Sequence, residues 1–346
     1  YLNLNIDQSG NYGNSFETKL YLQKEEKKLT ATDVCPGKSL SDCVIAQYTG
    51  IKNSNIYYHD SSLTNGAEDN SYRYAGASDA VNNYVCFGSN VAPCPADNLY
   101  RIIGVFGDKV KLIKSDYATT ALLGADGDYS KMYTANGWVN SAYKGNNLAN
   151  IAAYTWNYKN NTTINSGKGS NTWSTSLLNK TNLNKNFITN IGADWAAKIA
   201  ETTWKVGGNT WANIGTQPAK TAYQNEIVSP VTTNTTDNAT DYNAKVGLMY
   251  ASDYGFAAAP SAWTANLNNY SGEAIKNVNW MYMGLVEWTI SRYADDAYSA
   301  FSVSYAGLVP YDYAYYALAL RPVFYLTSFV NYVSGSGTAA DPIVVN

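Results

Sequence analysis

The strongest constraint on the fold is a pair of strand-like segments joined by a two-residue turn. Leu99–Phe106 reads LYRIIGVF, Gly107 and Asp108 follow, and Lys109–Lys114 reads KVKLIK. Two such runs separated by Gly-Asp predict a β-hairpin. Apolar and polar residues alternate in the second run, so we expect that strand to be half-buried, with one face open to solvent.

Helical and strand patterns occupy different parts of the chain. A helix is predicted over Ser39–Tyr48, where Ser39 and Ser41 can cap the first turn, and shorter helical patches lie between residues 174 and 228. Strand patterns dominate afterwards, and the last one lies near Ile343–Val345. This order predicts an α+β fold with mostly antiparallel strands, a few short helices and long loops.

The first 32 residues read differently from the rest. Tyr1–Ile6 alternates like a strand, and a second strand is predicted near Glu17–Leu22. We expect residues 1–32 to be a strand or hairpin segment left from an upstream or assembly module, and residues 33–346 to form the main domain. The chain has no initiator Met or signal peptide, so we expect any signal or anchor to lie upstream. No apolar run approaches about 18 residues, so no membrane-spanning helix is predicted.

Four cysteines form two pairs of equal spacing. Cys35 and Cys43 are eight residues apart, as are Cys86 and Cys94, and each pair brackets a loop with Gly or Pro. Two local disulfides are the simplest interpretation, each stabilising the fold by about 2–3 kcal/mol. A four-Cys zinc site is the alternative, although such sites usually need C-x₂₋₄-C spacing. Disulfides favour an oxidising, extracellular or cell-surface location.

Charge is scarce along the whole sequence. Charged residues make up 15% of the chain and the net charge is -3, whereas typical domains are about 25% charged. No Lys/Arg run is present, which argues against a nucleic-acid partner. The surface must be built largely from Asn, Thr, Ser, Tyr and Gly, as suits an extracellular protein.

The segment Tyr293–Ala317 has an unusual composition. It contains seven tyrosines and six alanines, and it lacks Lys, Arg, Glu, Gln, Met and Trp. Tyrosine offers a large amphipathic contact area at low entropy cost, and small neighbours let the rings reach a partner. Two apolar runs, Glu287–Ser291 and Leu318–Leu326, bracket the segment. A tyrosine-rich loop held between core strands predicts binding rather than catalysis.

Alternation along a strand at Ala300–Ser304 predicts which side chains face solvent. Phe301 and Val303 should point inward, whereas Ser302 and Ser304 should point outward. The alternative is that several of the seven tyrosines pack on one another or in the core, and we expect three or four to be exposed. The predicted ligand-binding residues are Tyr293, Asp296, Tyr298, Ser302, Ser304, Tyr305, Tyr311, Asp312, Tyr313 and Tyr316.

Several segments also carry a family resemblance. They are Asn70–Gly76, Tyr84–Gly88, Leu99–Phe106, Val246–Gly255, Glu287–Arg292 and Leu320–Leu326. Together they resemble a family of surface proteins from gut Firmicutes-type bacteria. The C-terminal part of that family is similar to the C-type-lectin-like fold of variable proteins diversified by diversity-generating retroelements. The resemblance covers roughly residues 65–346 and implies a variable region at about 293–318.

The composition of this region agrees with retroelement mutagenesis. Adenine mutagenesis of Asn-type codons ending in a pyrimidine cannot yield Lys, Gln, Glu, Met or Trp, and Tyr293–Ala317 lacks all five. Ordinary selection of a tyrosine-rich loop is the alternative. At Ala319 the family often has Gly, a departure that concerns the local backbone rather than the fold. The fold is related to the formylglycine-generating enzyme, which uses late cysteines, but no Cys follows Cys94, so that activity is not implied.

Patterns for catalysis and metal binding are weak. His59 is the only histidine, and no nucleophile motif accompanies it. Asp126-Gly-Asp128 resembles the start of a calcium loop, but the closing Glu is missing. We therefore predict no enzymatic activity, no cofactor and no metal. Three further residues are expected to be structural: Trp280, Trp288 and Arg321.

The combined prediction is a secreted or cell-surface bacterial protein, resembling an adhesin or receptor. Its tyrosine-rich variable surface would recognise a protein or glycan on a host or microbial surface. One alternative is a self-assembling subunit of a pilus or other surface filament, with residues 1–30 supplying an assembly strand. Another is a glycan-active hydrolase, which would need two carboxylates facing a cleft. Membrane attachment is expected only through a segment outside this chain.

Overall fold

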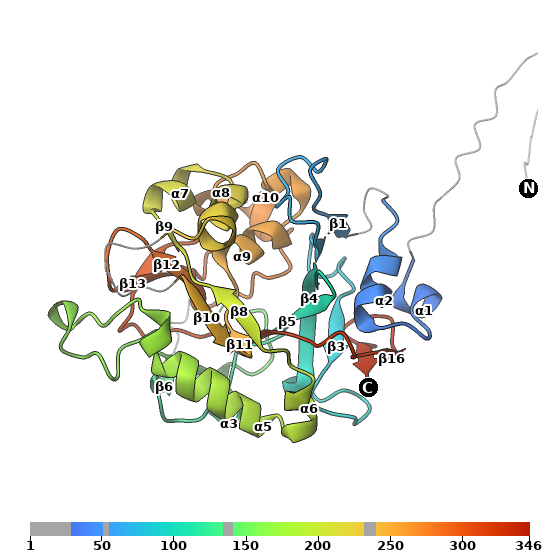
Figure 1. Cartoon of the computed structure of the whole chain (residues 1–346), viewed down its shortest axis with the longest axis horizontal. Coiled ribbons are helices and arrows are strands. Elements are labelled where there is room, and N and C mark those ends of the chain that lie inside the picture. Colours follow the sequence, from blue (N-terminus) through green and yellow to red (C-terminus); the bar gives the residue numbers. More distant parts are fainter. Residues whose placement is uncertain (1–28, 51–54, 134–140, 232–239) are drawn as a thin grey trace, which may run out of the picture.

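The computed structural model describes residues 29–50, 55–133, 141–231 and 240–346. These residues form an α+β fold of mostly antiparallel strands and short helices (Figure 1). The predicted fold class is confirmed at this level. Most of the strand or hairpin predicted in residues 1–32 falls outside the described residues.

A nine-stranded sheet forms the centre of the molecule. Its strands are β1 (Ile56–Tyr58), β2 (Tyr72–Tyr74), β3 (Tyr84–Cys86), β4 (Leu99–Phe106), β5 (Lys109–Lys114), β11 (Val246–Gly247), β15 (Val323–Tyr325), β16 (Tyr332–Ser334) and β17 (Ile343–Val345). The main path runs β11-β15-β5-β4-β3-β17-β16, and β2 and then β1 branch from β4. Only the pairing of β17 with β3 is parallel. The final strand lies where the sequence predicts it.

The predicted hairpin is present as β4 and β5, but its second strand is not half-buried. Phe106 pairs with Lys109 across the turn, where Gly107 has a φ of 63° that favours glycine. In β5, every residue from Val110 to Lys114 is buried. The expectation of an open face is wrong because other elements cover the polar side of the strand, where Lys111 meets a carboxylate from a distant helix.

Three smaller sheets accompany the central one. A four-stranded sheet has the order β14-β13-β12-β9, and only β9 and β12 run parallel. Two further sheets pair β10 with β8 and β6 with β7. The strands are β6 (Tyr129–Met132), β7 (Ala152–Tyr154), β8 (Thr202–Lys205), β9 (Gly208–Asn209), β10 (Asp241–Ala244), β12 (Glu287–Tyr293), β13 (Ser299–Val303) and β14 (Tyr311–Tyr313).

Short helices lie on both sides of the sheets. In Figure 1, α7 to α10 gather on one side and α3, α5 and α6 on the other. The helices are α1 (Ala31–Val34), α2 (Leu40–Gln47), α3 (Thr120–Leu123), α5 (Ile188–Asn190), α6 (Ala193–Ala197), α7 (Trp211–Thr216), α8 (Ala219–Tyr223), α9 (Ala251–Ala257) and α10 (Glu273–Lys276). Single 3₁₀ turns add Ala96–Asn98, Leu148–Asn150, Asn165–Gly167, Trp173–Thr175, Pro260–Ala262 and Leu267–Ser271, and π-helical turns add Leu178–Phe187 and Gln224–Val228. The helix predicted near Ser39 is confirmed, with the Ser39 hydroxyl accepting from the backbone N–H of Asp42.

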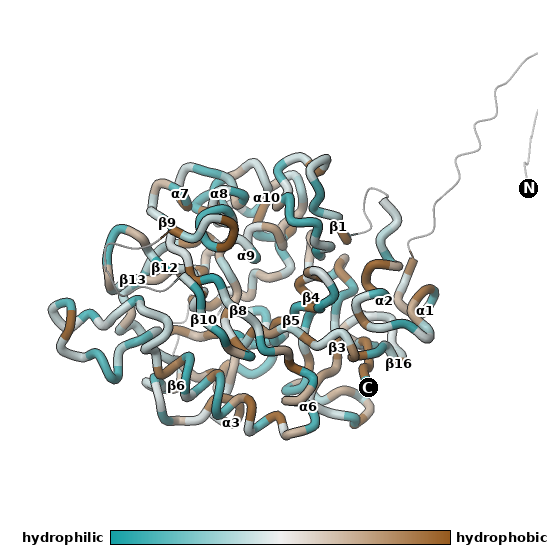
Figure 2. The backbone as a smooth tube through the Cα atoms, in the orientation of Figure 1, coloured by the Kyte–Doolittle hydropathy of each residue, from teal (hydrophilic) through white to brown (hydrophobic). Residues whose placement is uncertain are grey.

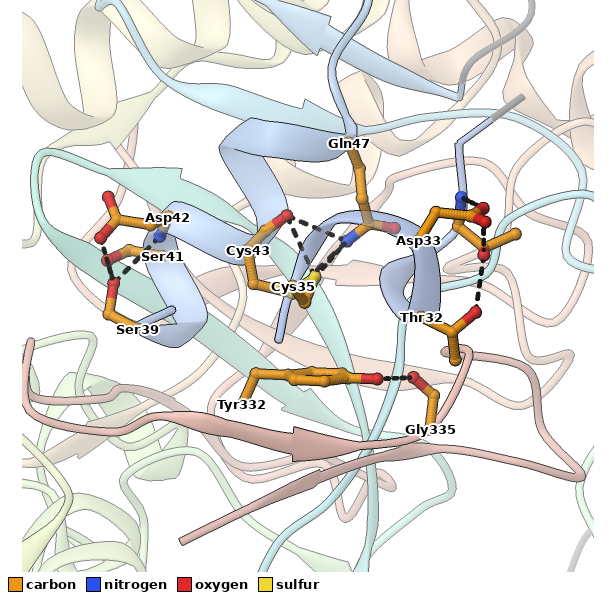
Figure 3. The surroundings of a disulfide bond; sticks show 11 residues. Thr32, Asp33, Cys35, Ser39, Ser41, Asp42, Cys43, Gln47, Tyr332 and Gly335 are labelled. Atoms are coloured by element: carbon orange, nitrogen blue, oxygen red, sulfur yellow. Dashed lines mark hydrogen bonds between the residues drawn. A yellow bond between two sulfur atoms is a disulfide. The ribbon is translucent and has the colours of Figure 1, made fainter. Parts of the chain in front are cut away.

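Both predicted disulfides are present, Cys35–Cys43 and Cys86–Cys94. The first joins α1 to α2, and the Gln47 side chain donates to the Cys43 carbonyl over 3.3 Å. Figure 3 shows these helices beside β16, where the Tyr332 hydroxyl donates to the Gly335 carbonyl. The backbone N–H of Leu40 donates to the Val330 carbonyl and that of Tyr332 to the Lys38 carbonyl, so the disulfide loop is attached to the C-terminal edge of the central sheet.

The core is rich in large aromatic side chains. Figure 2 shows apolar stretches of α2, β3 and β4 close together, around the central sheet. Within the described ranges, no helix is both long and apolar enough to span a bilayer. Among the residues that the structure describes, six tryptophans are fully buried, including the two that the sequence assigns to the core: Trp156, Trp173, Trp204, Trp263, Trp280 and Trp288.

Candidate ligand-binding surface

The tyrosine-rich segment follows β12 and contributes β13 and β14 to the four-stranded sheet. Phe301 of β13 pairs with Tyr311 of β14, and residues paired in this way lie on the same face of a sheet. Phe301 is fully buried, and the ring of Tyr293 contacts it edge-on at 5.7 Å between centroids. Phe301 is therefore the buried residue against which the ring of Tyr293 packs.

Two of the tyrosine rings stack directly on each other. Tyr293 and Tyr311 are parallel within 6°, with ring centroids 4.1 Å apart. Trp211, from α7, contacts Tyr311 edge-on at 6.0 Å. Offset stacking and edge contacts of this kind hold aromatic groups in place without charged partners.

A second group of rings continues along β14. Tyr313 lies two residues after Tyr311 and so on the same face of the strand. It contacts Tyr298 at 5.6 Å, and Tyr315 and Tyr316 at 5.7 Å each. We call the whole set the tyrosine face, and it comprises Tyr158, Trp211, Tyr293, Tyr298, Tyr311, Tyr313, Tyr315 and Tyr316.

One cation lies against the tyrosine face. The Lys168 ammonium is 4.4 Å from the ring centre of Tyr298 and 4.6 Å from that of Tyr313. Desolvation acts in the opposite direction, but contact with these two tyrosines raises the pKa of Lys168. The lysine therefore stays charged and adds a cation–π contact to the aromatic patch, where Asp295 also interacts with Tyr293.

All seven tyrosines of the segment keep some exposed surface. Tyr311 and Tyr316 are the most exposed, at 39% and 41%, and the other five are half-buried. The sequence predicts three or four exposed rings, whereas two are exposed and the other five are half-buried. The six rings other than Tyr305 pack on one another at the surface, so each of them contacts a neighbouring ring and keeps part of its surface exposed.

Five of the ten predicted ligand-binding residues lie outside this face, and three of these are Ser302, Ser304 and Asp312. Ser302 and Ser304 are buried, and the Ser302 hydroxyl donates to the Asp312 carboxylate over 2.5 Å. Asp312 pairs with Ala300, which alternates with Phe301, so it lies on the opposite side of the sheet from the tyrosines. The outward orientation predicted for both serines is wrong: Ser302 lies within β13, whose residues are all buried, and Ser304, just after that strand, is buried as well. Burial also raises the pKa of Asp312.

Asp296 holds the loop before β13. Its carboxylate accepts from the backbone N–H groups of Tyr298 and Ser299 and from the Ser299 hydroxyl, at 2.7 to 2.9 Å. From beneath, the buried Asn171 amide donates to the carbonyls of Tyr293, Asp296 and Ser299. These bonds fix the backbone that positions Tyr298.

Tyr305 lies apart from the tyrosine face. It packs beside a small buried cluster that includes Tyr117, Leu285 and Ala319. Its carbonyl accepts a hydrogen bond from the Tyr282 hydroxyl. Of the ten predicted residues, five tyrosines come together in one surface, and Tyr305 does not join them.

The sequence prediction missed four residues that complete the surface. Tyr315 lies in the segment itself, whereas Tyr158, Lys168 and Trp211 come from loops or helices far away along the chain. Tyr315 could have been found from the tyrosine count alone. No local pattern marks the other three, because their position depends on the tertiary fold.

His59 is buried in the aromatic core. Its Nδ1 accepts from the backbone N–H of Ala67, and its ring contacts Phe256 and Trp263. Burial, followed by the charge of Arg73, lowers the pKa of His59 well below its ordinary value. The ring is therefore a neutral part of the aromatic core.

In the segment that resembles a calcium loop, the Asp128 side chain hydrogen-bonds to other parts of the protein. The Asp128 carboxylate is buried and accepts from the Thr155 hydroxyl and from the backbone N–H groups of Tyr158, Lys159 and Leu178. Four donors bind the two oxygens of this carboxylate, so the Asp128 side chain holds together the segments that contain Thr155, Tyr158 and Leu178. Among the described residues, no three His, Cys, Asp or Glu side chains gather as metal ligands.

A carboxylate-lined cavity lies near the end of β5. It has a volume of about 220 Å³, and its lining includes Asp97, Lys114 and Asp116. Both Asp116 oxygens accept from the Tyr143 hydroxyl, and one also accepts from the backbone N–H of Asn146. This cavity is the place to test the hydrolase alternative, although one of its carboxylates is already engaged.

No protein-family model, no curated protein and no solved structure matches this chain.

Proposed function

We propose that this chain is a secreted or surface-displayed bacterial binding protein, and that the tyrosine face recognises a protein or glycan. The observation that carries the proposal is the convergence of eight aromatic rings on one solvent-facing side of a buried sheet. Clustered Tyr and Trp side chains supply much of the energy at recognition surfaces. The two disulfides support an oxidising location.

We further propose that the scaffold is a C-type-lectin-like domain and that residues 293–318 are its variable region. The mixed fold, with a separate sheet presenting this segment, supports the proposal. Sequencing of the flanking DNA tests the variability. A near-identical template repeat beside a reverse transcriptase gene is expected, and the lack of both would overturn diversification while leaving the binding proposal in place.

A four-residue variant tests binding directly. Tyr298, Tyr311, Tyr313 and Tyr316 are replaced together with Ser, and the protein is assayed on a glycan array and against a display library of extracellular domains. We expect a melting temperature within a few degrees of the parent, because exposed side chains contribute little to folding. Binding should fall by about 100-fold or more, since central aromatic contacts contribute about 2 kcal/mol or more each.

A second cluster of stacked tyrosines supplies the matched control. Tyr58 and Tyr72 stack at 4.5 Å, and Tyr48 contacts both rings. Replacing these three with Ser removes a similar aromatic area elsewhere on the surface and should leave binding unchanged. Equal loss of binding in both variants, or none in the first, would contradict the proposal.

Two alternatives need different experiments. A filament subunit depends on residues 1–30, nearly all of which lie outside the described residues, and electron microscopy of concentrated protein would reveal filaments. A glycan-active hydrolase would depend on the cavity near β5. Turnover in a hydrolase screen that is lost on Asp97→Asn or Asp116→Asn would favour it over the binding proposal.

A further inference from the structure

A buried lysine and a buried aspartate from distant parts of the chain meet behind the central sheet. The Nζ of Lys111, in β5, lies 2.5 Å from Oδ2 of Asp253, in the first turn of α9. The two residues are 142 positions apart, and each side chain is 1% exposed. The amine and the carboxyl group are therefore held in contact with no access to bulk water.

Aromatic rings enclose this pair. The ring centres of Phe106, Trp204, Tyr250 and Tyr325 lie 4.6 to 5.8 Å from the lysine nitrogen. Charges in such an enclosure lose their hydration, and the attraction between them often fails to recover that loss. Burial lowers the pKa of Lys111 even though Asp253 acts in the opposite direction, which shifts the lysine toward the free amine.

Two neighbouring charged residues, Arg73 and Asp69, form an ion pair beside Lys111 and Asp253. Arg73 reaches Asp253 at 3.6 Å, but it makes a closer pair with Asp69, which also accepts from Ser71 and from the Tyr223 hydroxyl. The buried charge cluster, defined as Asp69, Arg73, Lys111, Glu226 and Asp253, thus contains two cations with a carboxylate beside each and, in Glu226, a third carboxyl group. Loss of the Lys111 and Asp253 charges together would leave the other pair balanced.

We propose that Lys111 and Asp253 condense in the folded protein to form a side-chain amide cross-link. The free amine Nζ adds to Cγ of Asp253, the bond from Cγ to one carboxyl oxygen breaks, and that oxygen leaves as water. Of the three protons on the original ammonium, two leave with the water and one stays on the amide nitrogen. The remaining oxygen becomes the amide carbonyl and can keep the hydrogen bond from the Tyr250 N–H.

Glu226 is the group that we assign to proton exchange with this pair. It interacts electrostatically with both Lys111 and Asp253. Its carboxyl group accepts from the Ser291 hydroxyl at 2.5 Å and from the backbone N–H of Ser252 at 3.3 Å, next to the reacting aspartate. Burial raises the pKa of Glu226 to about 7, so it can give and take a proton near neutral pH.

Intact mass spectrometry of the purified, reduced wild-type chain tests the cross-link. We expect a mass lower than that of the sequence by one water molecule, and a proteolytic map in which the Lys111 and Asp253 peptides are joined. Lys205 and Asp241 provide an internal control, because they pair at 2.6 Å but are 39% and 50% exposed. Their peptides should be separate. A full sequence mass, or a water loss mapped to another site, would overturn the proposal.

Variants separate the chemistry from folding. Lys111→Met and Asp253→Ala should restore the full mass, whereas Asp253→Asn should lose ammonia in place of water. Glu226→Gln should lower the cross-linked fraction severalfold, and Lys205→Met should leave it unchanged. Complete cross-linking in Glu226→Gln would overturn the assigned role of Glu226. If a variant fails to fold, the wild-type mass and peptide map still decide the proposal.

Discussion

The tyrosine face and the buried charge cluster use polar groups in opposite ways. On the tyrosine face, rings stack at the surface, and Tyr311 and Tyr316 remain about two-fifths exposed. In the buried charge cluster, Lys111 and Asp253 meet inside an aromatic enclosure, and each side chain is 1% exposed. When a surface ring is removed by mutation, water can take its place against the neighbouring groups. A buried charge that loses its partner has no water to replace it.

The strand β12 joins these two kinds of environment. At its start, Glu287 forms a bidentate pair with Arg321 at 2.9 and 2.7 Å, and both side chains are fully buried. At its end, Tyr293 belongs to the tyrosine face. Arg321 is thus structural, as the sequence predicts. The seven residues of β12 therefore include both a buried ion pair and a surface aromatic contact, and the two can be compared within one strand.

The largest effect is expected at the buried end of this strand. Glu287→Ala leaves the Arg321 guanidinium without its carboxylate and should lower the free energy of unfolding by about 3–5 kcal/mol. Urea unfolding followed by tryptophan fluorescence measures the loss. The double variant Glu287→Ala with Arg321→Met should recover part of it, because no unpaired charge remains. A loss below about 1 kcal/mol would erase the distinction between buried charges and surface rings.

The pH dependence of Glu226 should give the next largest effect. Burial raises the pKa of Glu226 from 4.5 to about 7, so the native protein binds a proton that the unfolded chain has released between these values. Its contribution to stability is present below pH 4.5 and should fall by about 3 kcal/mol as the pH rises to about 7. The difference in unfolding free energy between the parent and Glu226→Gln, measured across this range, isolates the group. A difference independent of pH would contradict the prediction.

A smaller effect is expected where a buried polar group supports the tyrosine face. Asn171→Ala leaves the carbonyls of Tyr293, Asp296 and Ser299 without this donor. We expect a loss of about 1–3 kcal/mol in unfolding free energy, together with weaker binding by the tyrosine face. Asn160→Ala removes an exposed bond to the Thr175 carbonyl and serves as the control. If both variants behave alike, the tyrosine face does not depend on its buried support.

The smallest effect on stability should come from the rings themselves. Tyr311→Ser and Tyr316→Ser should each change the unfolding free energy by about 0.5 kcal/mol, because exposed substitutions rarely do more. Thermal unfolding of the single variants checks this, with Phe301→Ser as a contrast that removes the buried ring against which Tyr293 packs. Single losses above about 2 kcal/mol would show that the tyrosines are part of the core.

Local features of the fold could be predicted from the sequence, and features set by distant contacts could not. The hairpin at Gly107, the helix beginning after Ser39 and both disulfides depend on neighbouring residues, and all are present. The burial of Lys111 and Ser302 depends on what covers their strands. Alternation shows that neighbouring side chains point to opposite faces, but it cannot tell which face stays open.

The same distinction applies to the candidate site. Five of its tyrosines follow from composition and position in the chain, whereas Trp211 and Lys168 reach it from other elements. The sequence places Asp312 on the wrong side of the sheet because alternation alone does not give the register of β14 against β13. The pairing of Ala300 with Asp312 supplies that missing information.

The attachment of the first disulfide loop to the last strands has a practical consequence for handling the protein. Leu40 donates to the Val330 carbonyl and Tyr332 to the Lys38 carbonyl, so Thr30 and Asn346 lie at one edge of the molecule. Figure 1 places α1, α2 and the C-terminus on the side away from β12 and β13. A tether or fluorescent label attached at that edge would orient the tyrosine face outward, so immobilised protein on a sensor chip would present its binding side to the analyte.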